Sequence, residues 1–250
     1  MHEIEQYRFF LKDTIRKAID FRTTDQHKGV APPPLEHSVD PDLARIELPP
    51  LENWRQFIEK TDILTAMAGR QSRRRFTEAS LALEELAFLL WATQGVRRPD
   101  GRHPFYRTVP SAGARHSFET YLFVMRVDGL QEGLYRYLPV TNALVCLGDI
   151  DHLEERLSHA CLGQRFVAQG AVTFVWTTIP YRMEWRYALA AHRVILIDAG
   201  HVCQNLYLAC EAIHAGTCAI AAYDQEALDE LLGVDGADQF ALYLAPVGKR

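Results

Sequence analysis

The sequence predicts an α+β protein in which strands and helices pack as a sandwich. Strand-like runs rich in aromatic and β-branched residues recur along the chain, and helical runs lie between them. Strands and helices do not alternate strictly along the chain, whereas a fold built from βαβ units would require such alternation. With 250 residues, of which 48% are hydrophobic and 24% charged, the chain can bury a large core in one or two domains.

The first part of the chain predicts a helix followed by an irregular lead-in. Apolar residues at helical spacing indicate an amphipathic helix over residues 4–21. Six of the twelve prolines fall between residues 32 and 50, which excludes regular helix there. We therefore interpret residues 1–60 as a helix with a Pro-rich, surface-following lead-in, and residues 61–250 as the main domain.

The main domain begins with a helix and three strands. Residues 83–93 predict a short helix, because leucines recur on one side and Gly95 follows as a stop. Residues 118–127 predict a strand, since FETYLFVMRV is rich in aromatic and branched side chains. Residues 134–137 and 143–147 predict a hairpin, because the intervening PVTN turns the chain.

The second half adds a longer helix and the last strands. Residues 151–160 predict a helix with an acid near its N-terminus, where a carboxylate is favoured. Residues 187–214 predict a long, largely apolar helix that closes before Gly216. The other predicted elements are a buried strand at 171–179, a small-residue strand or turn at 217–223, a capped helix at 224–232 and a final strand at 240–247.

Basic residues are distributed unevenly along an acidic chain. The 27 Lys and Arg face 32 Asp and Glu, for a net charge of −5, and 22 of the 27 are Arg. Between residues 70 and 115, nine Arg accompany four acids. The overall acidity argues against a nucleic-acid-binding protein. Because Arg presents a planar fork to phosphate or carboxylate, the patch predicts a local anion site.

Other sequence features indicate the cellular environment in which the protein works. No apolar run approaches the ~20 residues that span a bilayer, and the first ten residues lack a signal-peptide core. The five Cys lack C-x-x-C spacing, which indicates reduced, mostly buried thiols and no metal site. His201 and Cys203 are two apart in the predicted long helix and face different ways, so a thiol nucleophile is not indicated. We expect a cytoplasmic protein without metal, membrane or nucleic acid.

Two motifs suggest a ligand site. In RQSRRRF (70–76), Arg70 and Arg74 share a face if the segment is helical, and Ser72 adds a hydroxyl between them. Such a set suits a phosphate monoester, with a solvated basic stretch as the alternative. In TVPSAGARH (108–116), small residues would let the backbone approach a flat ligand, with an ordinary loop as the alternative. Neither a G-x-G-x-x-G nor a P-loop motif is present.

Several segments taken together resemble the nitroreductase superfamily, and within it the SagB-type (thiazole/oxazole-forming oxidase) branch. They are RQSRRRF (70–76), LLWATQGV (89–96), RTVPSAGARHSFETYLFV (107–124), GLYRY (133–137), DAGHVCQNLYLA (198–209) and LYLAPVG (242–248). The resemblance implies a homodimeric FMN enzyme, with a nitroreductase-like α+β sandwich whose mixed, mainly antiparallel sheet is flanked by helices. It also implies that FMN lies at the dimer interface.

The same resemblance assigns cofactor-binding residues. Those for the FMN phosphate and ribityl chain are Arg70, Gln71, Ser72 and Arg74. Those lining the flavin ring, from the same chain or from the partner subunit, are Pro110, Ser111, Ala112 and Gly113. Ala221 and Ala222 match the segment whose backbone N–H contacts the flavin N5 edge.

The candidate catalytic pair departs from the branch pattern. Azoline-oxidising members carry a Lys-Tyr pair in a pattern like KYxxRxYR, whereas this chain has Arg186 and Tyr187, with Ala190 in place of the middle Arg. Arg does not readily act as a base, since its pKa exceeds ~12. Arg186 and Tyr187 are thus catalytic candidates, with plain surface packing as the alternative.

The resulting functional prediction is an FMN-dependent oxidoreductase that works by ping-pong hydride transfer. A SagB-type member would oxidise an azoline or related C–N bond in a small molecule or peptide. The alternatives are an NAD(P)H-dependent nitro or quinone reductase, and a non-catalytic flavin-binding subunit of a peptide-modifying complex. Motif order carries these predictions, while hydride chemistry would belong to the cofactor.

Overall fold

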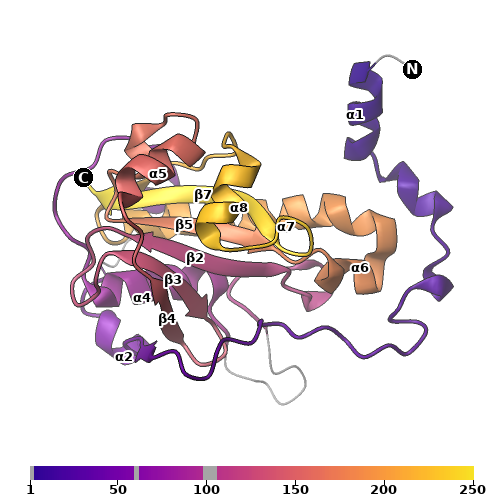
Figure 1. Cartoon of the computed structure of the whole chain (residues 1–250), viewed down its shortest axis with the longest axis horizontal. Coiled ribbons are helices and arrows are strands. Elements are labelled where there is room, and N and C mark those ends of the chain that lie inside the picture. Colours follow the sequence, from indigo (N-terminus) through magenta and orange to yellow (C-terminus); the bar gives the residue numbers. More distant parts are fainter. Residues whose placement is uncertain (1–2, 59–61, 98–105) are drawn as a thin grey trace.

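A computed structural model describes residues 3–58, 62–97 and 106–250 of the chain. Over these residues its centre is a seven-stranded sheet in the order β1-β4-β3-β2-β5-β7-β6, with each named pair antiparallel (Figure 1). The strands are β1 (Arg45–Glu47), β2 (Phe118–Val124), β3 (Gly133–Leu138), β4 (Ala143–Gly148), β5 (Val172–Thr178), β6 (Ala215–Thr217) and β7 (Phe240–Lys249). The predicted α+β class is confirmed.

The central strands are buried on both faces. Every residue of β2 and of β5 is buried, in keeping with sequences rich in aromatic and β-branched residues. In their register Leu122 lies opposite Phe174, and Phe123 opposite Thr173. Successive residues point to opposite faces, so each strand supplies two separate cores.

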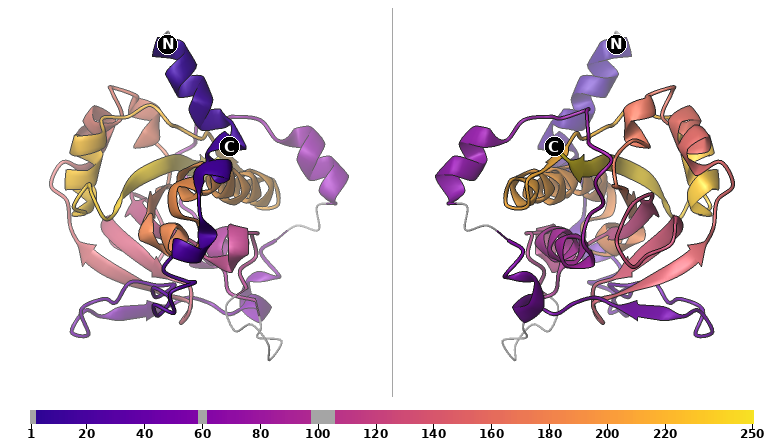
Figure 2. Two further views of the ribbon diagram at one scale, coloured as in Figure 1. Left: turned by 90° about the vertical axis from the view of Figure 1, so that its right-hand side faces the viewer. Right: turned by 90° about the vertical axis from the view of Figure 1, so that its left-hand side faces the viewer.

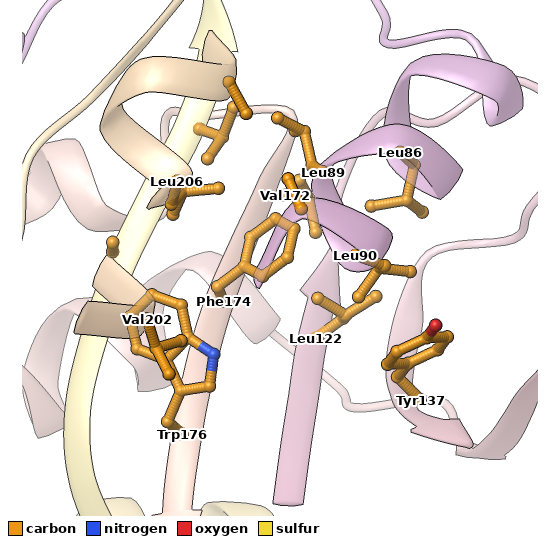
Figure 3. Close-up of a cluster of buried hydrophobic side chains, with 14 of the residues drawn as sticks. Leu86, Leu89, Leu90, Leu122, Tyr137, Val172, Phe174, Trp176, Val202 and Leu206 are labelled. Atoms are coloured by element: carbon orange, nitrogen blue, oxygen red, sulfur yellow. The ribbon is translucent and has the colours of Figure 1, made fainter. Parts of the chain in front are cut away.

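Helices α4 (Leu83–Gln94) and α7 (Ala191–Glu211) cover one face of the sheet. Figure 3 shows Leu86, Leu89 and Leu90 of α4 directed at the strands, beside Phe174. All three leucines are fully buried, as their spacing predicts. Burying each such side chain stabilises the fold by about 1.5–3 kcal/mol, so these leucines hold α4 against the sheet.

Helices α5 (Leu153–Ala160) and α8 (Gln225–Leu232) cover the opposite face. Leu157 and Leu228 are fully buried there against Phe123 and Val175. The side chain of Asp224 accepts a hydrogen bond from Ala227 N, which caps α8 as the sequence predicts. The protein is therefore a three-layer sandwich of helices, sheet and helices.

The predicted long helix over residues 187–214 is wrong at its start. A separate helix, α6 (Tyr181–Tyr187), and the 3₁₀ turn η5 (Ala188–Ala190) precede α7. The break falls at Ala188, whose φ of 46° and ψ of −132° are incompatible with a helix. No Gly or Pro marks the break in the sequence. The apolar periodicity continues across it, and for that reason the sequence predicts one continuous helix.

The N-terminal helix is also shorter than predicted. Helix α1 (Glu3–Leu11) stands away from the body in Figures 1 and 2. Lys12 is extended, and the 3₁₀ turn η1 (Asp13–Ala18) follows it. Asp13 accepts a hydrogen bond from Arg16 Nε at 2.7 Å within this turn. The remaining helical pieces of this region are η2 (Phe21–Thr23), α2 (Leu51–Trp54) and α3 (Ile63–Gly69).

Main-chain carbonyls of the Pro-rich lead-in accept hydrogen bonds from side chains of the body. Arg107 Nη2 donates to Leu35 O at 2.8 Å, and Arg136 Nη2 donates to His37 O. The indole of Trp185 donates to Val30 O at 3.0 Å. Prolines cannot donate main-chain hydrogen bonds, so side chains of the body hold this segment through its carbonyls instead.

The cysteines agree with the expectation of mostly buried thiols. Four of the five cysteines are buried, and Cys146 is half-buried. Burial raises the pKa of the Cys203 thiol to about 12, while His201 is exposed, so the two do not form a nucleophilic pair. Among the described residues, no helix combines the length and apolarity needed to cross a bilayer.

Candidate functional site

The predicted site residues lie in two separate surfaces. Pro110, Ser111, Ala112 and Gly113 lie beside Arg186 and Tyr187, and we call these six residues the loop patch. Arg70, Gln71, Ser72 and Arg74 lie in the neighbourhood of Ala221 and Ala222, and we call these six the arginine patch.

The loop patch is closely packed at Gly113. A Cβ added at this glycine would lie 2.6 Å from the Tyr187 hydroxyl and 2.9 Å from Arg186 Nε and Cδ. Gly113 also has a φ of +58°, a conformation that other residues rarely adopt. The structure thus brings together the small-residue loop and the candidate catalytic pair, which are more than 70 positions apart in the chain.

A buried carboxylate fixes the loop. Main-chain N–H of Ala112, at the start of the 3₁₀ turn η3 (Ala112–Ala114), donates to Asp198 Oδ2 at 3.2 Å. Burial raises the pKa of Asp198, and the bonds from the loop partly offset this effect. Ser111 Oγ accepts from His116 N at 2.9 Å, which closes the turn from its other side.

A cavity of about 770 Å³ lies against the loop patch. It is lined by Leu35 of the lead-in, by Arg97, Tyr106 and Arg107, by residues 108–111 and 113–116, and by Arg186 of α6. This volume is in the usual range for small-molecule sites. Pro110, Ser111, Gly113 and Arg186 therefore border a space that can hold a substrate-sized molecule.

His116 stays neutral behind this cavity. Burial lowers its pKa to about 3, and the positive charges of Arg107, Arg115 and Arg182 add to the effect. Burial likewise lowers the pKa of Arg107 to about 10, which keeps that guanidinium protonated at neutral pH. The wall of the cavity is therefore cationic through its arginines and not through its histidine.

A buried charge cluster supports the wall from beneath. Glu119 of β2 accepts hydrogen bonds from Arg182 Nη2 and, at 3.2 Å, from Arg136 Nε. Burial acts to raise the pKa of Glu119, but the two guanidinium groups outweigh it and hold the pKa below its usual value. Arg115 Nε donates to Arg182 O at 3.1 Å, which links this cluster to the loop.

The arginine patch is extended and not helical. Arg70 is the C-cap of α3, and Ser72 forms a parallel bridge with Thr217 of β6. Arg70 lies over the ring of Tyr207 at 5.2 Å, whereas Arg74 lies over the ring of Phe166 at 5.7 Å. The helical spacing considered for Arg70 and Arg74 is therefore wrong, and the two guanidinium groups rest on aromatic rings from opposite layers.

Tyr207 ties the two parts of the arginine patch together. Its hydroxyl is 2.9 Å from Ser72 Oγ and accepts from Ala219 N at 2.9 Å. Gln164, next to the 3₁₀ turn η4 (Arg165–Val167), donates to Ala222 O at 2.8 Å. Ala221 and Ala222 are exposed, and no hydrogen bond among the described residues uses their main-chain N–H groups. The patch thus offers guanidinium groups and exposed backbone amides, with the Ser72 hydroxyl beside them already paired with Tyr207.

The two patches lie on opposite flanks of α7. Asp198, under the loop patch, and Tyr207, under the arginine patch, are nine residues apart, which is two and a half helical turns and about 14 Å. The strip of α7 between them is exposed and includes Ile197, Gly200 and Gln204. The two patches of one chain therefore lie on different sides of α7, next to this exposed strip.

Sequence reasoning missed two residues that organise the patches. Asp198 and Tyr207 both lie in the DAGHVCQNLYLA segment, but neither was selected as a site residue. A carboxylate in an otherwise apolar helix is a usable signal, because a buried acid needs a partner. Arg98 and Arg102 of the Arg-rich region lie outside the described residues. Lys249 and Arg250 are engaged by Glu85 and Glu211, respectively.

Comparisons with solved structures show shared folds. A putative nitroreductase from Ralstonia eutropha JMP134 superposes with a TM-score of 0.68 at 24% identity, covering 88% of this chain and 94% of that one. A putative nitroreductase from Anabaena variabilis gives 0.67 at 22% identity; it matches 84% of this chain, which spans 42% of that protein's length. The E. coli microcin synthetase McbBCD complex with truncated pro-MccB17 bound gives 0.60 at 19% identity over 82% of this chain and 84% of that one.

Sequence comparison is more specific. Residues 67–249 match the model of the Nitroreductase family. The putative nitroreductase MJ1384 of Methanocaldococcus jannaschii is 31% identical over 209 residues, which cover 84% of this chain and 98% of that protein. The family match includes both patches, α7 and the whole sheet apart from β1. The chain therefore belongs to the nitroreductase family of oxidoreductases.

Proposed function

We propose that the protein is an FMN-dependent oxidoreductase whose flavin lies between the arginine patch of one subunit and the loop patch of its partner. The observation that carries this proposal is the position of the two patches on opposite flanks of α7. Each patch alone offers part of a flavin site: anion donors in one, and a small-residue loop beside Tyr187 in the other. A second copy is needed to make one site from both.

The residues present fit FMN chemically. Arg70, Arg74, Gln71 and Ser72 supply charged and neutral donors at the surface, which suits a phosphate dianion. The free N–H groups of Ala221 and Ala222 suit an acceptor edge of the ring. Gly113, with no side chain and a positive φ, lets the loop pack directly against Tyr187 and Arg186, which places both side chains beside the proposed ring position.

The dimer is proposed on the exposed strip of α7. Ile197 is 46% exposed there and Leu196 is 47% exposed, so the helix presents apolar surface to solvent. A two-fold axis through this strip would bring the loop patch of one copy next to the arginine patch of the other, because a symmetric interface pairs the same surface with itself. Dimer formation would then bury the exposed strip of α7 and complete the flavin site at the same time.

In this scheme bound FMN supplies hydride acceptance and donation, and the protein supplies position and proton control. The Ala221 and Ala222 amides would hold the N5 edge. Tyr187 Oη, next to Gly113, is the group placed to accept or pass a proton. Arg186 would contact substrate, because a guanidinium group is poorly suited to act as a base. One substrate would leave before the next enters, since both would use the cavity beside the loop patch.

We propose SagB-type oxidation of an azoline or related C–N bond as the reaction, on the basis of the PSAGAR and GLYRY segments. The alternative is NAD(P)H-dependent reduction of nitro compounds or quinones. It is favoured by the relative MJ1384, whose name describes a nitroreductase, and by Arg186 in place of a Lys. A non-catalytic flavin-binding subunit would bind FMN but exchange electrons with none of these substrates.

Turnover separates these candidates. Purified, FMN-loaded protein is mixed with NADH and a quinone, and in parallel with an azoline-containing peptide and oxygen. NADH-dependent quinone reduction supports the reductase, and azole formation supports the SagB-type oxidase. Bound flavin that is inert in both assays supports the non-catalytic subunit, and failure to bind FMN overturns the proposal.

Mixing two defective variants tests the shared site. Arg74→Ala damages the arginine patch and Gly113→Ala damages the loop patch. If each site takes one patch from each subunit, random mixing after unfolding and refolding restores FMN binding at about a quarter of the sites. If both patches of one chain serve the same flavin, mixing restores none.

A further inference from the structure

The cavity beside the loop patch is lined by positive charge without a counter-charge. Four of its lining residues are arginines, and none of its described lining residues is an acid. This is unusual in a chain whose acids outnumber its basic residues by five. A concave, partly apolar site with one sign of charge concentrates ligands of the opposite sign.

Two of these arginines are already used by the protein itself. Arg107 donates to Leu35 O at 2.8 Å and to Gln94 Oε1 at 2.6 Å. Arg115 donates to Pro33 O at 3.3 Å and stacks on Trp185 at 4.8 Å. Their donors hold the lead-in and the loop, so they form the wall and are not free to grip a ligand.

Arg186 is different. Its guanidinium is half-buried and lies over the Tyr187 ring at 5.6 Å, and no hydrogen bond or ion pair to it is found among the described residues. The nearby acid Glu184 is taken by His192 Nε2 at 2.8 Å. Burial and the charge of Arg186 both lower the pKa of Arg115, which is the signature of two cations held close without an anion between them.

Resting on the proposed function, we propose that Arg186 anchors a carboxylate of the substrate, so that the natural substrate is a small organic acid or carries a free carboxylate. The planar fork of Arg suits a carboxylate through two parallel hydrogen bonds. Because Arg186 touches both Gly113 and Tyr187, it would hold the substrate next to the proposed flavin ring and next to the phenolic hydroxyl. Arg in place of Lys then marks a change from proton transfer to anion binding.

Equilibrium binding tests this assignment. Benzoate and the isosteric, uncharged benzamide are titrated into the FMN-loaded protein by calorimetry, with wild type, Arg186→Gln, Arg186→Lys and the matched control Arg156→Gln on the exposed face of α5. We expect wild type and the control to bind benzoate at least about tenfold more tightly than benzamide. Arg186→Gln should remove the preference, and Arg186→Lys should keep part of it, because Lys retains the charge without the fork.

A second arm separates the substrate from the electron donor, whose phosphates are also anionic. Reduction of the flavin is followed with NADH and with the uncharged N-benzyl dihydronicotinamide. If Arg186 serves the substrate, Arg186→Gln changes the two donors equally while benzoate binding is lost. A KM increase for NADH alone, with benzoate preference intact, overturns the proposal and assigns Arg186 to the donor.

Failure of this inference is distinguishable from failure of the proposed function. Equal binding of benzoate and benzamide by a wild-type protein that holds FMN overturns the carboxylate anchor and leaves the flavin proposal standing. A protein that takes up no FMN overturns the function. In that case the same titrations on the flavin-free protein still decide whether Arg186 binds a carboxylate.

Discussion

The Tyr187 hydroxyl lies so close to Gly113 that a Cβ on residue 113 would be 2.6 Å from its oxygen. Real Cβ atoms do not approach an oxygen so closely, and the φ of +58° adds backbone strain for any side chain. The loop and the catalytic candidate Tyr187 therefore constrain each other's position. A substitution that enlarges residue 113 should displace Tyr187 or the loop.

Gly113→Ala should impair FMN binding more than it impairs folding. We expect FMN affinity to fall at least about tenfold, because relief of the clash moves the loop or Tyr187 away from the proposed ring position. Gly129→Ala is the matched control, since its φ is +82° and a Cβ there meets nothing within 4 Å. It should cost about 1–2 kcal/mol of stability and leave FMN affinity unchanged. Equal FMN affinities in the two variants would contradict the loop assignment.

Arg74→Ala should weaken FMN binding, and Arg75→Ala should not. Both arginines are exposed and adjacent in sequence, but only Arg74 belongs to the arginine patch. Loss of one charge-assisted hydrogen bond to phosphate costs about 1.5–3 kcal/mol, or roughly a tenfold to hundredfold weaker Kd. Fluorescence titration with FMN measures both variants. If both lose affinity alike, the patch acts as diffuse charge and not as a defined site.

His116 should make stability fall as the pH is lowered. Its folded pKa of about 3 lies below the usual 6.5, so the unfolded chain takes up a proton that the folded chain refuses. Stability is full above pH 6.5 and is lost below it, by up to ~1.4 kcal/mol per pH unit, until the pH reaches the folded pKa.

Urea denaturation at several pH values between these limits measures this slope. His116→Asn should flatten it, and Asn tolerates the φ of 48° found at this position. His152→Asn is the control, because His152 is exposed and has a similar φ of 55°. A slope that stays the same in His116→Asn would show that other groups carry the acid sensitivity.

Glu119→Gln should strongly destabilise the fold. It removes the negative charge shared by the buried Arg136 and Arg182, and breaking such a pair costs about 3–5 kcal/mol. Glu78→Gln, which removes an exposed acid 3.7 Å from Arg126, should cost less than about 1 kcal/mol. The free energy of unfolding in urea distinguishes the two. A small loss in Glu119→Gln would mean that main-chain carbonyls, those of His37 and Ser38 for Arg136 and that of His116 for Arg182, are enough to satisfy both arginines.

Much of the fold was predictable because burial leaves periodic signals. The leucines of α4 and the aromatic and branched residues of β2 each had one plausible interpretation, and both predictions hold. The start of α7 was not predictable, since Ala188 is a good helix former whose left-handed φ is imposed by tertiary packing. Local propensity could not show that α6 and α7 meet at an angle there.

Motifs in the sequence were enough to predict the site residues, but they could not predict how these residues are arranged in space. RQSRRRF and PSAGAR stand out in the sequence, yet spacing could not place them on opposite flanks of α7. The separation depends on Asp198 and Tyr207, whose roles follow from long-range hydrogen bonds. The contacts of the lead-in were also not predictable from the sequence. Residues 30–38 bind the body through main-chain carbonyls, which every residue has, so no residue type marks them. We retain the division at residue 60 as a proposal, with this lead-in forming one wall of the cavity.

The most direct test of the central claim is the visible absorption spectrum of the purified protein during FMN titration. We predict a yellow protein that binds one FMN per chain, that loses its blue-light absorption when an electron donor is added without oxygen, and that regains it with a quinone. A colourless protein that takes up no added FMN would contradict the account.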